Sequence, residues 1–172
     1  MNKCVFLDRD GVLNQDLDGY LYQTHLVRFP EGVREGLSQL KQAGFLLIVI
    51  TNQAGISKGL YGPEEVRQVH DFLNTAYGNV LDDLYFAPEH EAFTTRSLSR
   101  KPGSLLIERA MARYRIDPRL SWMIGDQERD VTAGNKAGVK TILIKNTAVA
   151  TEADLRVADF SSAVKAILEG GY

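Results

Sequence analysis

Stretches of consecutive apolar residues alternate along this chain with stretches in which apolar residues recur every three or four positions. The first kind predicts strands that are buried on both faces of a sheet, and the second predicts amphipathic helices. Strands that alternate with helices form βαβ units, in which neighbouring strands run parallel. The sequence therefore predicts a Rossmann-like α/β fold, with a doubly wound parallel sheet as the middle of three layers.

Glycine and proline residues mark most of the expected boundaries between these elements. The expected strands cover residues 4–7, 45–50, 84–87, 122–124 and 140–144. The expected helices cover residues 30–43, 63–77, 105–115 and 130–137, with a last helix that starts at a Ser161 or Ser162 cap. In this last helix we expect Val164, Ile167 and Leu168 to face the core. Residues 15–29 and 88–99 are expected to be loops.

The composition of the chain limits its organisation and its partners. With 172 residues, 44% of them hydrophobic, residues 1–172 are expected to form a single domain, as a monomer or a small homo-oligomer. The formal charge is −2 without long runs of either sign, which disfavours nucleic-acid and membrane partners. We find neither a secretory leader nor a membrane span and expect a cytoplasmic protein. Cys4 is the only cysteine, and its apolar neighbours indicate a core residue rather than a catalytic thiol.

Polar side chains gather where predicted strands or loops end. The four clusters are Asp8 with Asp10, Thr51 with Asn52, Arg100 with Lys101, and Asp126 with Asp130. Because the carboxyl ends of parallel strands meet at one edge of a sheet, we expect these clusters to converge. Converging carboxylates repel one another unless a cation lies between them, and an oxygen-rich site suits Mg²⁺. Each motif alone has an ordinary interpretation as a turn or a surface charge, but their joint order favours a functional site.

The residue types in these clusters match the needs of phosphoryl transfer, whose transition state carries negative charge on three oxygens. We expect Asp8 to attack phosphorus and form an aspartyl phosphate, and Asp10 to protonate the leaving alcohol and then activate water. Thr51 and Lys101 are expected to stabilise the phosphoryl oxygens, and Asp126 to bind the metal together with Asp8. For Asp130 we weigh metal binding through water against a role in capping the next helix, and we favour the cap.

The motifs DRDG, TNQ, RKP and GDQERD occur in this order, and with them the chain resembles the haloacid dehalogenase (HAD) superfamily of aspartate-nucleophile phosphatases. FLDRDGVLN, TNQAGISKGLY and SRKPGSLL are similar to its histidinol-phosphate and heptose-bisphosphate phosphatase group. The resemblance covers nearly the whole chain and implies the same roles for Asp8, Thr51, Lys101 and Asp126. It further implies that the backbone carbonyl of Asp10 binds the metal.

We expect a small phosphorylated substrate at this site, and the resemblance implies that Arg100 contacts it. The residues expected to contact it are Gly11, Tyr20, Asn52, Gln53 and Arg100. The intervals between the motifs leave no room for a cap domain, so we expect an open site whose specificity comes from loops 16–26 and 88–99. In loop 88–99 or directly after it, Arg96 or Arg100 is expected to hold a second anionic group.

The chain departs from that group in two places. Many members carry a zinc loop, but the matching positions here are Ala87, Glu89, Ser97 and Ser99, so we expect no structural zinc. Gln127 stands where the heptose enzymes often have a lysine, which removes a positive charge beside the phosphate.

Four interpretations follow from the sequence. The first is a Mg²⁺-dependent phosphatase acting on a sugar bisphosphate, with heptose 1,7-bisphosphate as the expected substrate. Histidinol phosphate is the nearest alternative substrate, and 3′-phosphates of nucleic acid ends are disfavoured by the near-neutral charge. A receiver-like signalling module also combines aspartates, Mg²⁺, threonine and lysine, but it needs no acid/base residue in the position of Asp10.

Overall fold

The computed structural model describes residues 1–17, 19–145 and 150–170. In this part of the chain six strands form one sheet in the order β3-β2-β1-β4-β5-β6, and all neighbouring strands are parallel. The strands are β1 (Cys4–Leu7), β2 (Leu46–Asn52), β3 (Asp83–Ala87), β4 (Trp122–Gly125), β5 (Lys140–Ile144) and β6 (Leu155–Val157). This is the strand order of a Rossmann-type sheet. The predicted α/β class is confirmed.

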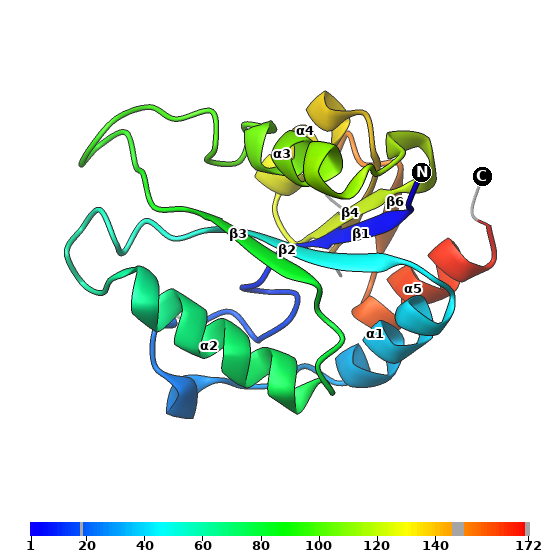
Figure 1. The fold of residues 1–172 in the computed structure, drawn as a ribbon, viewed down its shortest axis with the longest axis horizontal. Helices are drawn as coiled ribbons and strands as arrows, with labels where there is room; N and C mark the ends of the chain where they lie inside the picture. Colours follow the sequence, from blue (N-terminus) through cyan, green and yellow to red (C-terminus); the bar gives the residue numbers. More distant parts are fainter. Residues whose placement is uncertain (18, 146–149, 171–172) are drawn as a thin grey trace.

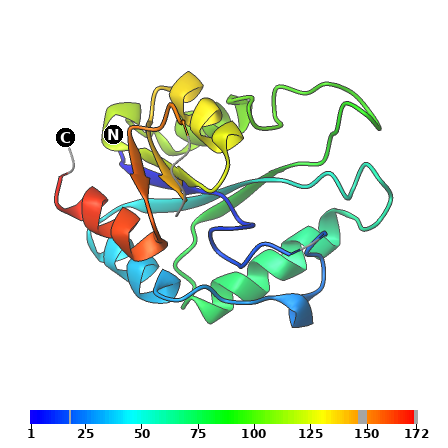
Figure 2. The same ribbon diagram turned by 180° about the vertical axis from the view of Figure 1, so that it is seen from behind.

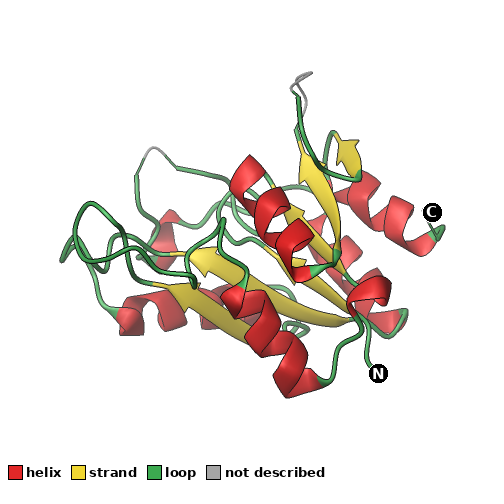
Figure 3. Cartoon of the chain, turned by 90° about the horizontal axis from the view of Figure 1, so that it is seen from above, coloured by secondary structure: helices red, strands yellow, loops and turns green. Residues whose placement is uncertain are grey.

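Helices cover both faces of the sheet and make the outer two of three layers (Figures 1 and 3). On one face lie α1 (Val33–Gln42), α2 (Pro63–Ala76) and α5 (Phe160–Leu168), and on the other α3 (Leu105–Tyr114) and α4 (Glu128–Ala137). Side chains of β1 alternate between the two cores, so that Val5 and Leu7 pack on the α1 side and Cys4 and Phe6 on the α3 side. Cys4 is a core residue, as expected, and burial raises the pKa of its thiol.

Several element boundaries differ from the predictions. Strand β2 continues through Asn52, because residues 51 and 52 pair with Phe86 and Ala87 of β3. Helix α1 begins only at Val33, since Gly32 precedes it in the left-handed region with φ of 76°. Helix α4 begins at Glu128, two residues before the predicted start, because the Asp130 side chain accepts a hydrogen bond from the backbone N–H of Gln127.

The C-terminal part contains the two clearest errors of the prediction. Strand β6 was not expected, and its three residues are too few for a sequence pattern to reveal. Helix α5 is capped by Asp159, whose carboxylate accepts a hydrogen bond from Ser162 N, and not by Ser161 or Ser162. Leu168 ends this helix and is 41% exposed, because the buried face of the helix ends one residue earlier, at Ile167.

The loops that follow β2 and β3 leave the sheet at the same end (Figures 1 and 2). In the described residues, the connection from β1 to α1 contains one 3-10 helix, Thr24–Leu26, and the connections from β2 to α2 and from β3 to α3 contain no helix or strand. A second 3-10 helix, Pro118–Leu120, precedes β4. No helix in the described ranges has the length and apolar character needed to cross a membrane. The strand order also differs from the 2-1-3-4-5 order of receiver-type sheets.

Candidate active site

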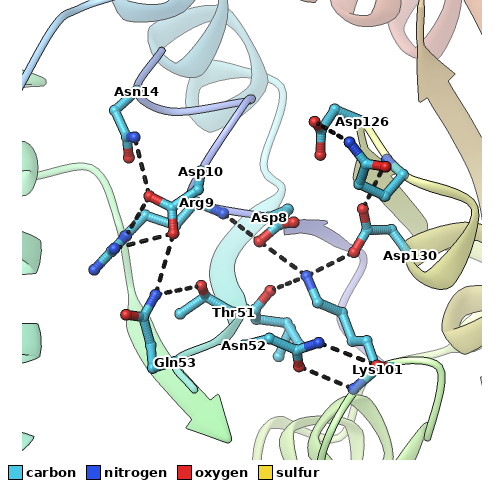
Figure 4. A network of polar contacts seen from close by, with 12 residues as sticks. Asp8, Arg9, Asp10, Asn14, Thr51, Asn52, Gln53, Lys101, Asp126 and Asp130 are labelled. Atoms are coloured by element: carbon cyan, nitrogen blue, oxygen red, sulfur yellow. Dashed lines mark hydrogen bonds and ion pairs between the residues drawn. The ribbon is translucent and has the colours of Figure 1, made fainter. Parts of the chain in front are cut away.

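Three carboxylates meet at the carboxyl edge of the sheet (Figure 4). Asp8 directly follows β1, Asp126 directly follows β4, and Asp130 lies in the first turn of α4. Because β1 and β4 are parallel neighbours, their ends coincide, and the backbone N–H of Asp8 donates a hydrogen bond to Ile124 O at 3.0 Å. One carboxylate oxygen from each of the three aspartates lies within 4.8 Å of the others. We call these residues the carboxylate cluster.

Lys101 extends from the loop before α3 into the cluster and is 2% exposed. Its Nζ lies 2.9 Å from Asp8 Oδ1 and 2.7 Å from Asp130 Oδ1, and it donates a hydrogen bond to Ile50 O at 2.7 Å. Asn52 fixes the lysine backbone, because its side chain exchanges two hydrogen bonds of 3.0 Å with Lys101 N and O. The long side chain is therefore held at both ends.

The cluster carries more negative charge than Lys101 neutralises. Burial raises the pKa of Asp8, and the Asp130 carboxylate raises it further. Burial also raises the pKa of Asp126. Burial alone would lower the pKa of Lys101, but the carboxylates of Asp130 and Asp8 outweigh this effect and raise it. The protein thus concentrates three carboxylates around one ammonium group in a place that water does not reach freely.

This arrangement fits a divalent cation. Asp126 Oδ1 is buried without a hydrogen-bond partner among the described residues, while Oδ2 accepts one from Gln127 Nε2 at 2.9 Å. An unpartnered, buried carboxylate oxygen is costly unless a cation approaches it. The ligand atoms are hard oxygens, as Mg²⁺ prefers. In the described part of the chain, no other group of three or more His, Cys, Asp or Glu side chains lies close enough to hold a metal.

Two glycines allow the carboxylates this close approach. A Cβ on Gly11 would lie 2.5 Å from Asp126 Oδ2, and Gly11 also has a φ of +86°. A Cβ on Gly125 would lie 2.2 Å from Asp130 Cβ. A side chain at either position would displace a member of the cluster.

The Asp10 carboxylate points away from the cluster (Figure 4). Its Oδ1 accepts hydrogen bonds from Arg9 Nε at 3.1 Å and Asn14 Nδ2 at 3.0 Å. Its Oδ2 accepts hydrogen bonds from Arg9 Nη2 at 3.0 Å and Gln53 Nε2 at 3.2 Å. Arg9 is 1% exposed and also donates to Leu21 O, which ties this network to the loop after β1. Asp10 is therefore separate from the carboxylate cluster and has a rigid orientation.

A cleft of about 210 Å³ opens beside Asp10. Five sequence-predicted residues line it, namely Asp10, Tyr20, Asn52, Gln53 and Arg100. Arg100 is half-buried, and its Nη1 donates a hydrogen bond to Glu89 O at 3.4 Å. Gly11 lies instead against Asp126, and Arg96 lines a neighbouring hollow that also contains Arg100 and Lys101.

The cleft is also lined by His90, which belongs to the expected specificity loop 88–99, and by Arg129, which the sequence analysis did not single out. Arg129 lies within the GDQERD motif, between two aspartates, where its only signal was its charge. Arg129 lies close enough to affect Arg100. Burial lowers the pKa of Arg100, and the positive charge of Arg129 lowers it further. Asp130 was expected chiefly as a helix cap, and the structure shows that it caps α4 and also pairs with Lys101.

The chain is similar in sequence to known proteins. The profile of the HAD-hydrolase-like family matches residues 98–166. A D-glycero-beta-D-manno-heptose-1,7-bisphosphate 7-phosphatase from Haemophilus ducreyi is 37% identical over 160 residues, which cover 88% of this chain and 87% of that protein. A D-glycero-alpha-D-manno-heptose-1,7-bisphosphate 7-phosphatase from Burkholderia mallei is 36% identical over 151 residues, which cover 83% of this chain and 79% of that protein.

The fold is also similar to solved structures. A D,D-heptose 1.7-bisphosphate phosphatase from B. bronchiseptica, complexed with magnesium and phosphate, superposes with a TM-score of 0.88 over 98% of this chain and 99% of that chain. The sequence identity in this pair is 24%, so the match concerns the fold. A HAD-like phosphatase structure from Mesorhizobium loti gives a TM-score of 0.86 over 99% of this chain and 88% of that chain.

Proposed function

Because the chain belongs to the HAD-like hydrolase family, in the group that contains the heptose-1,7-bisphosphate 7-phosphatases, we propose that it removes the 7-phosphate of D-glycero-D-manno-heptose 1,7-bisphosphate through an aspartyl phosphate on Asp8. That the chain is a phosphatase follows from its family and relatives. The observation that carries the proposal is the position of Asp8, buried beside Lys101 and a pair of further carboxylates, with Asp10 two residues later lining a cleft that also contains two arginines.

Asp8 is suited to attack on phosphorus because its side chain cannot rotate freely. Its Oδ1 accepts a hydrogen bond from Arg9 N at 2.7 Å and pairs with Lys101 Nζ. In the proposed reaction a carboxylate oxygen of Asp8 bonds to phosphorus as the bond to the sugar oxygen breaks. Lys101 and Thr51, both nearly completely buried, offset the negative charge on the phosphoryl oxygens.

Asp10 is suited to move protons because it lies two residues beyond Asp8 and lines the cleft where the sugar would enter. In the first half of the reaction, a protonated Asp10 gives its proton to the leaving sugar oxygen. In the second half, the carboxylate takes a proton from the water that attacks phosphorus and frees Asp8. The four hydrogen bonds that Asp10 accepts fix the orientation of its carboxylate in this structure and suit the ionised form, which the second half of the reaction uses.

Asp8, Asp126 and Asp130 are the side chains that would hold Mg²⁺, and the resemblance adds the Asp10 carbonyl to this set. When bound, the ion supplies positive charge that offsets both the carboxylates and the phosphate oxygens. Without it, a phosphate would approach a site with excess negative charge.

Arg100 and Arg129 support a substrate with two phosphates. Both line the cleft beside Asp10, and their like charges interact with each other. Gln127, which stands in the place of a lysine, is not assigned to the second phosphate, because its amide donates a hydrogen bond to Asp126. We therefore assign the second phosphate of the substrate to the two guanidinium groups, each of which can form bidentate hydrogen bonds with phosphate.

A phosphate-release assay tests the substrate assignment. The panel contains the alpha and beta anomers of heptose 1,7-bisphosphate, the corresponding 7-monophosphate, histidinol phosphate and unrelated sugar phosphates, each with Mg²⁺ and with EDTA. We expect the highest kcat/KM for one anomer of the bisphosphate and no turnover with EDTA. If histidinol phosphate or the unrelated monophosphates are hydrolysed as well as the bisphosphate, the substrate assignment is wrong although the chemistry stands.

Arg129→Ala tests the second phosphate site. We expect KM for the bisphosphate to rise about 10-fold and KM for the 7-monophosphate to stay unchanged, because only the bisphosphate has a group for this arginine. Arg34→Ala, which removes an exposed arginine of α1, is the matched control. An equal rise in KM for both substrates would contradict the assignment.

A further inference from the structure

The Gln53 side chain connects the two residues to which the reaction assigns proton transfer and phosphoryl binding. Its Nε2 donates hydrogen bonds to Thr51 Oγ1 at 2.9 Å and to Asp10 Oδ2 at 3.2 Å (Figure 4). Gln53 is 2% exposed, so water cannot readily replace either partner. The amide thus faces two acceptors with its NH₂ group.

An amide side chain can turn over and exchange its NH₂ and its oxygen at little cost in shape. If Gln53 turned over, its carbonyl oxygen would face the Asp10 carboxylate, and Thr51 Oγ1 would lose its donor. Two acceptors in contact repel each other, and a buried group without a partner costs stability. The two acceptors therefore favour the observed orientation beyond the shape of the pocket.

The Tyr61 hydroxyl completes the hydrogen bonding of the amide at its other end. It donates a hydrogen bond to Gln53 Oε1 at 2.7 Å. Burial raises the pKa of Tyr61 to about 12, so the hydroxyl keeps its proton at any working pH and remains a donor. This hydrogen bond to Oε1 anchors the amide in the orientation that points its NH₂ group toward Asp10 and Thr51.

The fold holds the Tyr61 ring firmly in this place. The ring is 8% exposed and stacks on Tyr22, with 5.1 Å between ring centroids and 12° between planes. The ring also lies against Gly55, where a Cβ would lie 2.0 Å from a ring atom. Gly55 is therefore required for the close packing that brings the Tyr61 hydroxyl to Gln53.

We propose that Tyr61 is a positioning residue, which acts through the Gln53 amide to orient the Thr51 hydroxyl and the Asp10 carboxylate. Because Thr51 Oγ1 accepts from Gln53, its own hydrogen is free to be donated to a phosphoryl oxygen. Tyr61 itself touches neither residue. This inference rests on the proposed roles of Asp10 and Thr51, but it does not depend on which phosphate monoester is the substrate.

Tyr61→Phe removes the hydroxyl and keeps the ring with its stacking on Tyr22. We expect kcat to fall about 10-fold, while KM changes less than about twofold, because the substrate does not contact Tyr61. Tyr114→Phe is the matched control, since it removes another hydrogen-bonded tyrosine hydroxyl, which donates to Asp83 at the start of β3, at the opposite edge of the sheet from the site. Its kcat should equal that of the wild type. Equal losses in both variants would mean that Tyr61 is merely structural.

A double-mutant cycle with Gln53→Met tests whether Tyr61 acts through the amide. If it does, Tyr61→Phe lowers kcat in the wild type but has no further effect in the Gln53→Met protein. Independent, multiplying losses would overturn the proposal. The cycle can use any phosphate monoester that the wild type hydrolyses, so an incorrect heptose assignment leaves it valid.

Hydrogen exchange of the Gln53 side-chain amide gives a measure that needs no turnover. The amide protons should exchange with solvent at least about 10-fold faster in Tyr61→Phe than in the wild type, as measured by NMR. Unchanged exchange would contradict the proposal even if kcat fell. An absence of phosphatase activity in the wild type would refute the proposed function and leave this structural measurement to decide the role of Tyr61.

Discussion

Gly11 shows how a single backbone position shapes the candidate metal site. Its φ of +86° lies in the left-handed region, and the space where a Cβ would stand is occupied by the Asp126 carboxylate. A glycine is thus required here for two reasons, the turn after Asp10 and the close contact with Asp126. The sequence revealed the turn, since Asp-Gly is a common turn pair. It gave no sign of the contact, which joins residues far apart in the chain.

Gly11→Ala should therefore impair the metal site more than its effect on folding alone explains. We expect the affinity for Mg²⁺ to fall at least about 10-fold, because the new methyl group would displace Asp126. Backbone strain should lower the free energy of unfolding by about 1–3 kcal/mol. Isothermal titration with Mg²⁺ and urea unfolding measure the two effects.

Gly59→Ala is the matched control for backbone strain. Gly59 has a φ of +70°, but a Cβ there would meet nothing within 4 Å. This variant should lose similar stability and keep the Mg²⁺ affinity of the wild type. If both variants bind Mg²⁺ equally well, the contact between Gly11 and Asp126 does not matter for the metal.

The predicted site residues differ in how well their places follow from sequence. Asp8 and Asp126 each follow a buried strand directly, so the parallel sheet alone brings them together. The path of a long side chain is a tertiary property, and so the sequence could not show that Lys101 also pairs with Asp130. For the same reason Arg129, an exposed residue of α4, gave no sign that it lines the cleft.

At the scale of elements, the sequence located long and buried elements well and short or peripheral ones poorly. The residues of β1 are all completely buried, and an unbroken apolar run is the direct sign of this. Strand β6 has three residues at the edge of the sheet and no such run. The error at α5 arose because Asp159 and Ser161 are both good caps, and only the structure shows which one accepts the hydrogen bond.

His70 of α2 should make stability depend on pH. Burial lowers the pKa of His70 below its ordinary value of 6.5, and its Nδ1 is buried without a hydrogen-bond partner in the described residues. The unfolded chain therefore binds a proton at a higher pH than the folded one. The stabilisation from neutral His70 is complete above about pH 6.5 and is lost as pH falls through the lower folded-state pKa.

The measurement is urea unfolding of the wild type and His70→Leu at pH 5.5 and 7.5. We expect the free energy of unfolding of the variant to decline less between these pH values than that of the wild type. His25→Leu, at an exposed histidine, is the control and should follow the wild type. An equal decline in the free energy of unfolding for all three proteins would show that His70 has the same pKa in the folded and the unfolded state.

At the scale of the whole molecule, the topology of the parallel sheet determines both the fold and the position of the site. The parallel sheet with strand order β3-β2-β1-β4-β5-β6 places the ends of β1, β2 and β4 side by side. Asp8 follows β1, Thr51 lies at the end of β2 and Asp126 follows β4, while Lys101 reaches them from the loop before α3. The same arrangement brings together carboxylates that repel one another, and this repulsion destabilises the folded chain. A bound cation should therefore stabilise the whole fold.

Mg²⁺ at 100 times its Kd should raise the free energy of unfolding by about 2.7 kcal/mol, since it binds the folded state alone. EDTA should reverse the effect. Asp126→Asn should abolish it, because the substitution removes a charge from the cluster. Asp71→Asn, at an exposed aspartate of α2, should retain it. Thermal or urea unfolding with and without Mg²⁺ checks this, and an equal gain in Asp126→Asn would place the ion elsewhere.

The central claim is that Asp8 becomes phosphorylated during turnover. The most direct test is to quench the enzyme in acid during hydrolysis of its substrate, reduce it with borohydride and analyse its peptides by mass spectrometry. An aspartyl phosphate is reduced to homoserine, whereas a free aspartate is not. We predict homoserine at position 8, only when substrate and Mg²⁺ are present. Homoserine at another aspartate, or an unmodified Asp8 in an enzyme that is turning over, would contradict the account.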